Sequence, residues 1–125
     1  MKKTLFATLL AVSFLSAPAF AAGDAKSGAD LFDNNCSDCH SVKEDGGNRK
    51  GPNLFGVVGR KTGAVSGFEY SDANRSAGWV WNADTLDHYL TNPKEAIPGT
   101  IMKFKGSLSA AERADLIAFL STLKK

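Results

Sequence analysis

The pattern of hydrophobic and polar positions predicts a mainly helical protein. The clearest pattern lies near the C-terminal end, where four apolar residues repeat at helical spacing: Leu116, Ile117, Leu120 and Leu123. Ser109, followed three positions later by Glu112, predicts a capping box at the start of this helix. The chain contains no alternating strand pattern and no internal repeat, so we expect an all-α fold.

Three further helices are expected before this one. The first runs from about Asp24 to Asn34, with Asp24 as its N-cap. A short helix from Ser71 to Gly78 follows, and a third runs from Asn82 or Ala83 to Thr91. Pro93 ends the third helix, because proline cannot continue the ladder of backbone hydrogen bonds.

Glycine and proline mark the less regular parts of the chain. Gly28 lies inside the first predicted helix, where it costs stability; it is either a tolerated weakness or a point where another helix crosses closely. Residues 41–65 are rich in Gly, Asn, Lys and Arg, and residues 94–107 contain a Pro98-Gly99 turn before Met102. Both segments are predicted loops, and loops of this length usually serve a site.

Residues 1–21 are predicted to be a cleaved signal peptide. Lys2 and Lys3 precede an apolar run that is too short for a membrane span, and Pro18 and small residues follow it at once. We therefore expect export to the periplasm, cleavage near Ala22 and no stable membrane insertion. Residues 22–125 then form one domain, whose modest apolar core would gain from a large buried cofactor.

Charge changes the list of expected partners. Of the 15 Lys and Arg residues, two lie in the predicted leader, and the remaining 13 equal the 13 Asp and Glu residues. A mature chain with a formal charge of zero is a poor match for nucleic acid or an anionic membrane surface. The two cysteines of an exported chain would ordinarily suggest a disulfide, but their spacing indicates other chemistry.

Cys36-Ser37-Asp38-Cys39-His40 is a C-x-x-C-H segment. This spacing is typical of covalent haem attachment, in which two thiols add to the two vinyl groups and the adjoining imidazole binds iron. A turn after a helix would place both sulfurs against neighbouring edges of one macrocycle. We therefore predict one haem c per chain, bound through Cys36 and Cys39, with His40 as an iron ligand.

Three other interpretations of the cysteines fit less well. A thiol redox site is expected near a βαβ pattern, which the sequence lacks, and a structural disulfide has no need of an adjoining His40. Zinc would need four ligands, whereas the second histidine, His88, lies far along the chain from the cysteines.

The second axial ligand is predicted to be Met102. Met1 leaves with the signal peptide, so Met102 is the only methionine of the mature chain, and a His/Met pair is a known haem arrangement. A lone methionine is usually a core residue, but this one follows a Pro98-Gly99 turn. His88 is the alternative ligand, although its spacing from Leu86 favours a solvated position.

At this point the sequence resembles the class I cytochromes c, the mitochondrial type and its soluble bacterial relatives. The resemblance covers nearly the whole mature chain, and it rests on these segments in order: Gly23-Asp24, Gly28, Phe32, Cys36 to His40, Gly51 to Leu54, Gly59 to Gly63, Gly67-Phe68, Tyr70 to Asn74, Trp81, Thr85-Leu86, Tyr89-Leu90, Asn92 to Lys94, Ile97 to Thr100, Met102, and Asp115 to Leu120. It implies helices and long loops wrapped around one haem, with the first and last helices crossing at Gly28.

The resemblance also implies roles around the haem. The carbonyl of Pro52 would accept a hydrogen bond from His40, while Tyr89 and Thr100 would bond near Met102 and the inner propionate. A further set would hold the buried propionate and its water, for which ordinary packing is the alternative: Arg60, Tyr70, Asn74 and Trp81.

These features predict a monomeric one-electron carrier and not an enzyme. Its donor and acceptor would be redox proteins such as a membrane oxidase, a cytochrome complex or a periplasmic dehydrogenase. A peroxidase or sensor with a labile distal ligand is the rival interpretation, and a thiol oxidoreductase is a third. The lysine ring of the mitochondrial relatives is reduced here to a smaller set, Lys94, Lys103 and Lys105, while other ring positions differ: Asp30, Asn35, Glu95 and Ile101.

Overall fold

The computed structural model describes residues 22–125, and the predicted signal peptide lies outside the described residues. Five helices occur in this part of the chain, listed in order: α1 (Ala25–Asn35), α2 (Asp72–Ser76), α3 (Ala83–Thr91), α4 (Pro93–Ala96) and α5 (Ala110–Ser121). No strand is present between residues 22 and 125, where Lys61 and Val80 form a single isolated bridge. The predicted all-α fold is confirmed.

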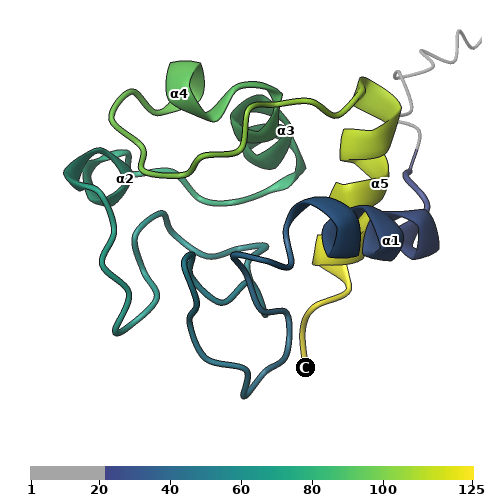
Figure 1. Ribbon diagram of the computed structural model, residues 1–125, viewed down its shortest axis with the longest axis horizontal. Coiled ribbons are helices and arrows are strands. Elements are labelled where there is room, and N and C mark those ends of the chain that lie inside the picture. Colours follow the sequence, from purple (N-terminus) through teal and green to yellow (C-terminus); the bar gives the residue numbers. More distant parts are fainter. Residues whose placement is uncertain (1–21) are drawn as a thin grey trace, which may run out of the picture.

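The first and last helices cross, as Figure 1 shows. Gly28 makes this crossing possible, because a Cβ there would collide with the backbone carbonyl of Asp115 and with Phe119. The side chain of Asp115 accepts a hydrogen bond from the backbone N–H of Asp24 at 2.7 Å. Asp24 in turn caps α1 through the N–H groups of its first turn. Of the two interpretations of Gly28, the close helix crossing is therefore the correct one.

Two predicted boundaries need correction. The short helix α2 is confined to Asp72–Ser76, because Ser71 is its N-cap and Gly78 adopts a φ of 69° that a helix does not allow. Residues 94–107 are not entirely loop, because Pro93 begins the one-turn helix α4. Proline suits the first position of a helix, and a single turn is too short to produce a periodic pattern.

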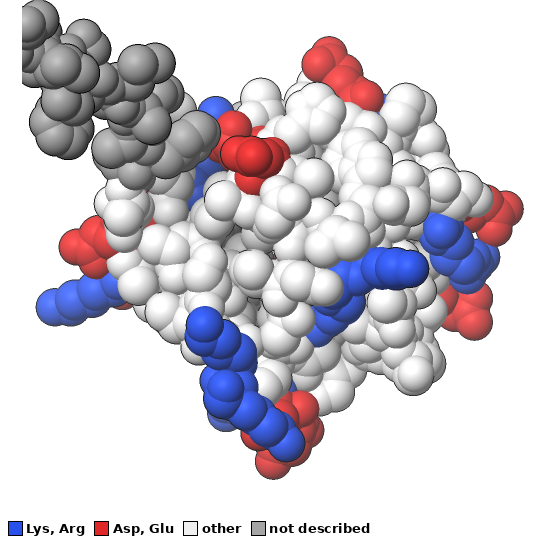
Figure 2. Space-filling model, turned by 180° about the vertical axis from the view of Figure 1, so that it is seen from behind, with Lys and Arg blue, Asp and Glu red and all other residues white. Residues whose placement is uncertain are grey.

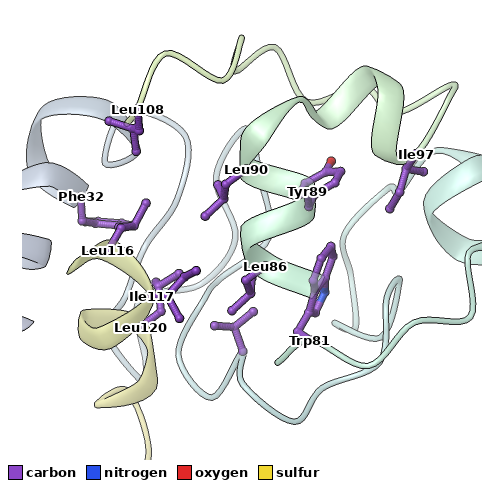
Figure 3. Packing of buried hydrophobic residues seen from close by; sticks show 11 residues of the cluster. Phe32, Trp81, Leu86, Tyr89, Leu90, Ile97, Leu108, Leu116, Ile117 and Leu120 are labelled. Atoms are coloured by element: carbon purple, nitrogen blue, oxygen red, sulfur yellow. The ribbon is translucent and has the colours of Figure 1, made fainter. Parts of the chain in front are cut away.

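The apolar core lies between α1, α3 and α5. Figure 3 shows side chains of α3 and α5 directed toward each other, with Phe32 of α1 beside Leu116. The buried hydrophobic residues are Phe32, Val57, Trp81, Leu86, Tyr89, Leu90, Ile97, Leu108, Leu116, Ile117 and Leu120. Six of these residues also line a cavity: Val57, Trp81, Leu86, Tyr89, Leu90 and Leu120. The core is therefore built around an internal space.

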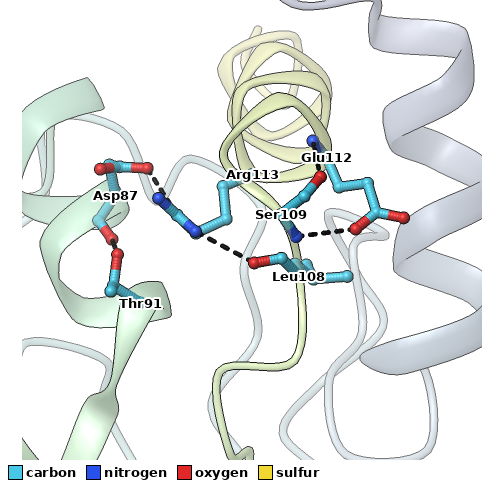
Figure 4. A network of polar contacts seen from close by, with 6 residues as sticks. All are labelled: Asp87, Thr91, Leu108, Ser109, Glu112 and Arg113. Atoms are coloured by element: carbon cyan, nitrogen blue, oxygen red, sulfur yellow. Dashed lines mark hydrogen bonds and ion pairs between the residues drawn. The ribbon is translucent and has the colours of Figure 1, made fainter.

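Polar contacts join α3 to the start of α5 (Figure 4). The Arg113 Nε atom donates to Asp87 Oδ1 at 2.7 Å, and Nη1 of the same side chain donates to the Leu108 carbonyl at 3.0 Å. The predicted capping box of Ser109 and Glu112 is present with both of its hydrogen bonds. These contacts hold α3, one wall of the cavity, against the C-terminal helix.

None of the described helices is long and apolar enough to cross a membrane.

Candidate functional site

A cavity of about 700 Å³ lies inside the fold. Its walls come from the end of α1, the loop after it, α3, the loop around Met102, and α5. All eleven residues that the sequence predicted for the site line this cavity: Cys36, Cys39, His40, Pro52, Arg60, Tyr70, Asn74, Trp81, Tyr89, Thr100 and Met102. The structure thus brings together residues that lie between Cys36 and Met102 in the chain.

The two cysteines lie on a turn that follows α1 directly. The N–H groups of Cys39 and His40 both donate to the carbonyl of Cys36, at 3.0 and 2.9 Å. The N–H of Gly51 donates to the Cys39 carbonyl at 2.8 Å, which fixes the turn against the next loop. Both sulfurs therefore stand on one rigid turn at the edge of the cavity.

The environment of Cys36 does not favour thiol redox chemistry. Both Cys36 and Cys39 are free and half-buried. Burial, together with repulsion from Cys39, raises the pKa of Cys36 to about 11. Reactive C-x-x-C sites have a lowered pKa, because the thiolate is the nucleophile. The environment of Cys36 therefore disfavours the thiol oxidoreductase interpretation.

His40 is buried and held in one tautomer. Its Nδ1 atom lies 2.8 Å from the carbonyl oxygen of Pro52. A carbonyl oxygen only accepts, so Nδ1 carries the hydrogen and donates it, and Nε2 keeps a free lone pair. Burial lowers the pKa of His40, although the bond to Pro52 opposes this. The neutral imidazole is the form that ligates a metal.

Gly51 is required beside His40. A Cβ at this position would collide with the imidazole ring. The Gly51-Pro52 pair therefore lets the loop approach the ring closely and supplies the carbonyl that orients it.

Met102 stands in the loop that follows α4. The N–H of Thr100 donates to the carbonyl of Ile97 at 3.0 Å, closing a turn in which Gly99 has a φ of 96°. The N–H of Met102 then donates to Thr100 Oγ1 at 3.3 Å, and that oxygen lies 2.6 Å from the hydroxyl of Tyr89 on α3. This chain of contacts ties the position of Met102 to α3.

His88, the alternative ligand, does not line this cavity. It is exposed on α3, and its ring lies against that of Trp79 with centroids 5.6 Å apart. The cavity is therefore lined by one imidazole, from His40, and one thioether, from Met102.

Arg60 places a cation in the cavity wall. Its guanidinium donates to the backbone carbonyls of Asn53, at 2.7 Å, and Phe55. Burial lowers the pKa of Arg60, while the neighbouring Tyr70 raises it. Arg60 thus ties down the loop that contains Pro52 as well as facing the cavity.

The other three predicted polar residues of this wall are held by their own neighbours. The hydroxyl of Tyr70 accepts from the N–H of Val65 at 3.1 Å. The N–H of Asn74 donates to the capping hydroxyl of Ser71. Burial raises the pKa of Tyr89, and a hydrogen bond with the side chain of Asn74 opposes this effect. Trp81 is 8% exposed, and its N–H donates to the Arg60 carbonyl at 2.8 Å.

Sequence reasoning missed Asn53 as a structural residue of the site. Its Nδ2 donates to the Lys43 carbonyl at 2.8 Å, and its Oδ1 accepts from the N–H of Phe55 at 2.7 Å. The N–H of Asn53 also donates to Asn48 Oδ1 at 2.9 Å. Asparagine favours such local bonds to the backbone, so its place after Gly51-Pro52 was the available signal.

The remaining lining residues are mainly apolar, and sequence reasoning did not assign them to a site: they include Leu54, Val57, Phe68, Leu86, Leu90, Ile101, Phe104 and Leu120. An apolar cavity with two thiols at its edge, an oriented imidazole and a thioether fits an iron porphyrin joined to the chain by thioether bonds. When bound, such a haem takes up and releases one electron at its iron.

Comparisons with known proteins agree with this geometry. The cytochrome c family profile matches residues 25–124. A cytochrome c of Gibberella zeae is 54% identical over 105 residues, which cover 84% of this chain and 99% of the relative. A cytochrome c of Stellaria longipes is 53% identical over 106 residues, covering 85% of this chain and 98% of the relative. One from Arabidopsis thaliana is 53% identical over 98 residues, or 78% of this chain and 88% of the relative. The chain therefore belongs to the cytochrome c family, as a single-haem electron carrier and not an enzyme, with haem c attached at the Cys36-x-x-Cys39-His40 motif.

Proposed function

We propose that this chain carries single electrons between redox proteins of the periplasm, with His40 and Met102 as the two axial ligands of its iron. The observation that carries the proposal is the cavity itself, because the imidazole of His40 and the thioether of Met102 line it from different loops. With both axial positions filled by the chain, no substrate would bind to iron, and the group would exchange electrons only.

The proposed ligation depends on how the chain orients His40. The Pro52 carbonyl accepts a hydrogen bond from Nδ1, which leaves the lone pair of Nε2 free and strengthens Nε2 as a metal ligand. The thioether of Met102 is a neutral, soft ligand, and such ligation raises the reduction potential relative to a second imidazole. Pro52 and Met102, which produce these two effects, lie in loops. The loop of Pro52 is bonded to the cysteine turn, and the loop of Met102 is bonded to α3.

The polar wall formed by Arg60, Tyr70, Asn74 and Trp81 would hold a haem propionate. A carboxylate is costly to bury unless a cation or hydrogen-bond donors compensate it. Arg60 is the cation of this wall, Tyr70 is close enough to influence its pKa, and Asn74 lines the same cavity. The proposal therefore assigns this wall to charge compensation and not to catalysis.

The periplasmic location rests on residues 1–21, which we propose are removed to leave a domain of residues 22–125. The basic start, the short apolar run and the small residues before Ala22 support cleavage. The match to the family profile begins at residue 25, after this segment. The relatives named above are fungal and plant proteins, so the compartment is argued from the leader alone.

Partners would meet the carrier at the mouth of the cavity. Lys50, Lys103 and Asp38 are exposed and line the cavity, so cations and one carboxylate face an approaching protein. Figure 2 shows basic and acidic side chains interspersed over the face seen there. We propose a monomer, because a single chain supplies every residue of the cavity wall described above.

The test is ligand binding to the reduced, haem-loaded protein. Carbon monoxide and cyanide should react slowly at neutral pH, because the chain already occupies both axial positions. Redox titration of the same sample should show one electron per chain. Rapid carbon monoxide binding without denaturant would contradict the proposed Met102 ligation and favour the rival haem enzyme or sensor.

A further inference from the structure

A row of three hydrogen bonds leads from His40 to the surface of the protein. His40 Nδ1 donates to the Pro52 carbonyl at 2.8 Å. The N–H of the next residue, Asn53, donates to Asn48 Oδ1 at 2.9 Å. Asn48 Nδ2 in turn donates to the Ser66 carbonyl at 3.1 Å. Because Asn48 is exposed, the row connects a buried imidazole to a side chain in contact with solvent.

The middle of the row is a single peptide group. The C=O of Pro52 and the N–H of Asn53 belong to one planar trans unit, so they point in opposite directions. An amide that donates through its N–H becomes a better acceptor at its oxygen, because electron density shifts from nitrogen to oxygen. The bond from Asn53 to Asn48 should therefore strengthen the Pro52 carbonyl as the partner of His40, by about 10–30% for each bond in the row.

The side chain of Asn48 is a second amide with the same direction. A carbonyl oxygen only accepts and a backbone N–H only donates, so Ser66 and Asn53 determine which end of the Asn48 carboxamide is nitrogen. Donation from Nδ2 to Ser66 makes Oδ1 a better acceptor for Asn53. Each of the two amides accepts on the side nearer to His40 and donates on the other side, so their effects add.

The peptide group is also held by contacts that do not involve the side chain of Asn48. Asn53 Nδ2 donates to the Lys43 carbonyl at 2.8 Å, and Asn53 Oδ1 accepts from the N–H of Phe55 at 2.7 Å. The carbonyl of Asn53 accepts from the Arg60 guanidinium at 2.7 Å. A substitution at Asn48 therefore removes one bond to the peptide group and leaves the other contacts of Asn53 in place.

We propose that Asn48 is a positioning residue for His40: by polarising the peptide between Pro52 and Asn53, it draws the Nδ1 hydrogen of His40 toward the carbonyl and makes Nε2 a stronger metal ligand. The inference rests on the proposed ligation of iron by His40 and does not depend on Met102. Sequence reasoning assigned no role to Asn48.

The test measures the bond from His40 to Pro52 in the reduced, haem-loaded protein. Proton NMR gives the chemical shift of the Nδ1 hydrogen of His40, which moves downfield as its hydrogen bond strengthens. In the wild type, the carbon-bound ring protons of His40 should show the large ring-current shift of an axial haem ligand. Absence of that shift would overturn the proposed ligation by His40, and this inference with it.

Two substitutions at Asn48 should give opposite results. Asn48→Ala removes the acceptor of the Asn53 N–H, so the Nδ1 hydrogen of His40 should move upfield. Asn48→Asp replaces the carboxamide by a carboxylate, which is a stronger acceptor for the same N–H, so the Nδ1 hydrogen should move downfield of the wild type. Both variants lose the bond to Ser66, so a purely structural role of Asn48 predicts the same change in both.

A third variant controls for charge. Lys43→Gln changes the formal charge as Asn48→Asp does, but at an exposed side chain, and it keeps the backbone carbonyl that Asn53 contacts. It should leave the Nδ1 hydrogen of His40 near its wild-type position. Circular dichroism and the haem absorption spectrum check the folding of each variant.

The proposal is overturned if Asn48→Asp moves the Nδ1 hydrogen upfield or leaves it unchanged, while the wild type shows the ring-current shift of His40. That result would leave the ligation by His40 intact. A downfield shift of the same size in Lys43→Gln would also overturn it, because charge alone would then explain the effect. If Asn48→Ala does not fold, the direction of the shift in Asn48→Asp decides alone.

Discussion

At the scale of single residues, Thr100 has a larger structural role than its sequence position suggests. Its hydroxyl lies 2.6 Å from that of Tyr89 and accepts from the N–H of Met102 at 3.3 Å. One small side chain therefore joins α3 to the loop that carries the proposed sulfur ligand. The resemblance implied hydrogen bonds at this place, whereas the pattern of apolar positions did not.

Replacing Thr100 by valine tests this role. Thr100→Val keeps the shape but leaves the buried hydroxyl of Tyr89 without this partner, so the free energy of unfolding should fall by about 1 to 3 kcal/mol. Thr100→Ser keeps the hydroxyl and should lose much less. Denaturant unfolding of the two haem-loaded variants measures the difference. A loss in Thr100→Val no larger than that in Thr100→Ser would mean that the hydroxyl of Thr100 contributes no more to stability than its methyl group.

Removing the thioether tests the proposed iron ligation. In Met102→Ala the cavity wall loses its only sulfur donor apart from the two cysteines, so carbon monoxide should bind the reduced protein much faster than in the wild type. His88→Ala is the matched control, because His88 does not line the cavity. If the histidine variant gains carbon monoxide binding and the methionine variant does not, the ligand assignment is wrong.

The cysteine turn was the most predictable part of the site. Its chemistry depends on five consecutive residues, so spacing alone predicts the haem attachment. The bond from His40 to Pro52 joins residues that are twelve positions apart, and only resemblance to a family implied it. Asn53 was missed because its three hydrogen bonds depend on the path of the loop, which no periodic pattern predicts.

At the scale of helices, the crossing of α1 and α5 organises the fold. Gly28 brings the two backbones together, and Asp115 of α5 accepts from the backbone N–H at the start of α1. Because α1 leads directly into the cysteine turn, this crossing also positions the sulfurs at the edge of the cavity. Helix packing and cofactor attachment are thus connected through one short segment.

Adding a methyl group at the crossing should destabilise the protein. Gly28→Ala forces a Cβ against the Asp115 carbonyl and Phe119, and overpacking of this kind costs about 1 to 3 kcal/mol or more. Ser27→Ala, at an exposed position of the same helix, should have little effect. Thermal unfolding of both variants makes the comparison. An unchanged melting temperature in Gly28→Ala would show that the helices can move apart freely.

Helix prediction succeeded where caps and apolar repeats coincide. The starts of α1, α3 and α5 agree with the sequence to within a residue, because Asp24, Asn82 and Ser109 cap their first turns. The apolar repeat predicted for the last helix extends to Leu123, whereas α5 ends at Ser121. The one-turn helix α4 was not predicted, since four residues cannot display a period of 3.6. Its start at Pro93 was misinterpreted as only the end of the preceding helix.

At the scale of the whole molecule, the fold is a shell of helices and loops around a cavity. Helical periodicity identified several side chains that pack inward, such as Leu86 and Leu120, but it could not show that both would line an internal space. Nor could it show that Trp79 and Trp81 touch, because that contact depends on an isolated backbone bridge. Cavities and ring contacts depend on where distant segments meet.

The charge of the cavity mouth should be detectable with a small redox probe. Lys103 is exposed and lines the cavity, so Lys103→Glu should slow oxidation by the anion ferricyanide several-fold at low ionic strength. Lys26→Glu changes the net charge equally but lies on α1, outside the cavity lining. Stopped-flow rates compare the two. Equal slowing would mean that electrons do not leave through this mouth.

The most direct measurement of the whole account is the mass of the exported protein after extraction into acidified organic solvent. The account predicts one species, with the mass of a chain beginning near Ala22 plus one haem, and no pigment in the organic phase. A bare polypeptide with free haem in the solvent, or a colourless protein from a haem-competent host, would contradict covalent attachment at Cys36 and Cys39.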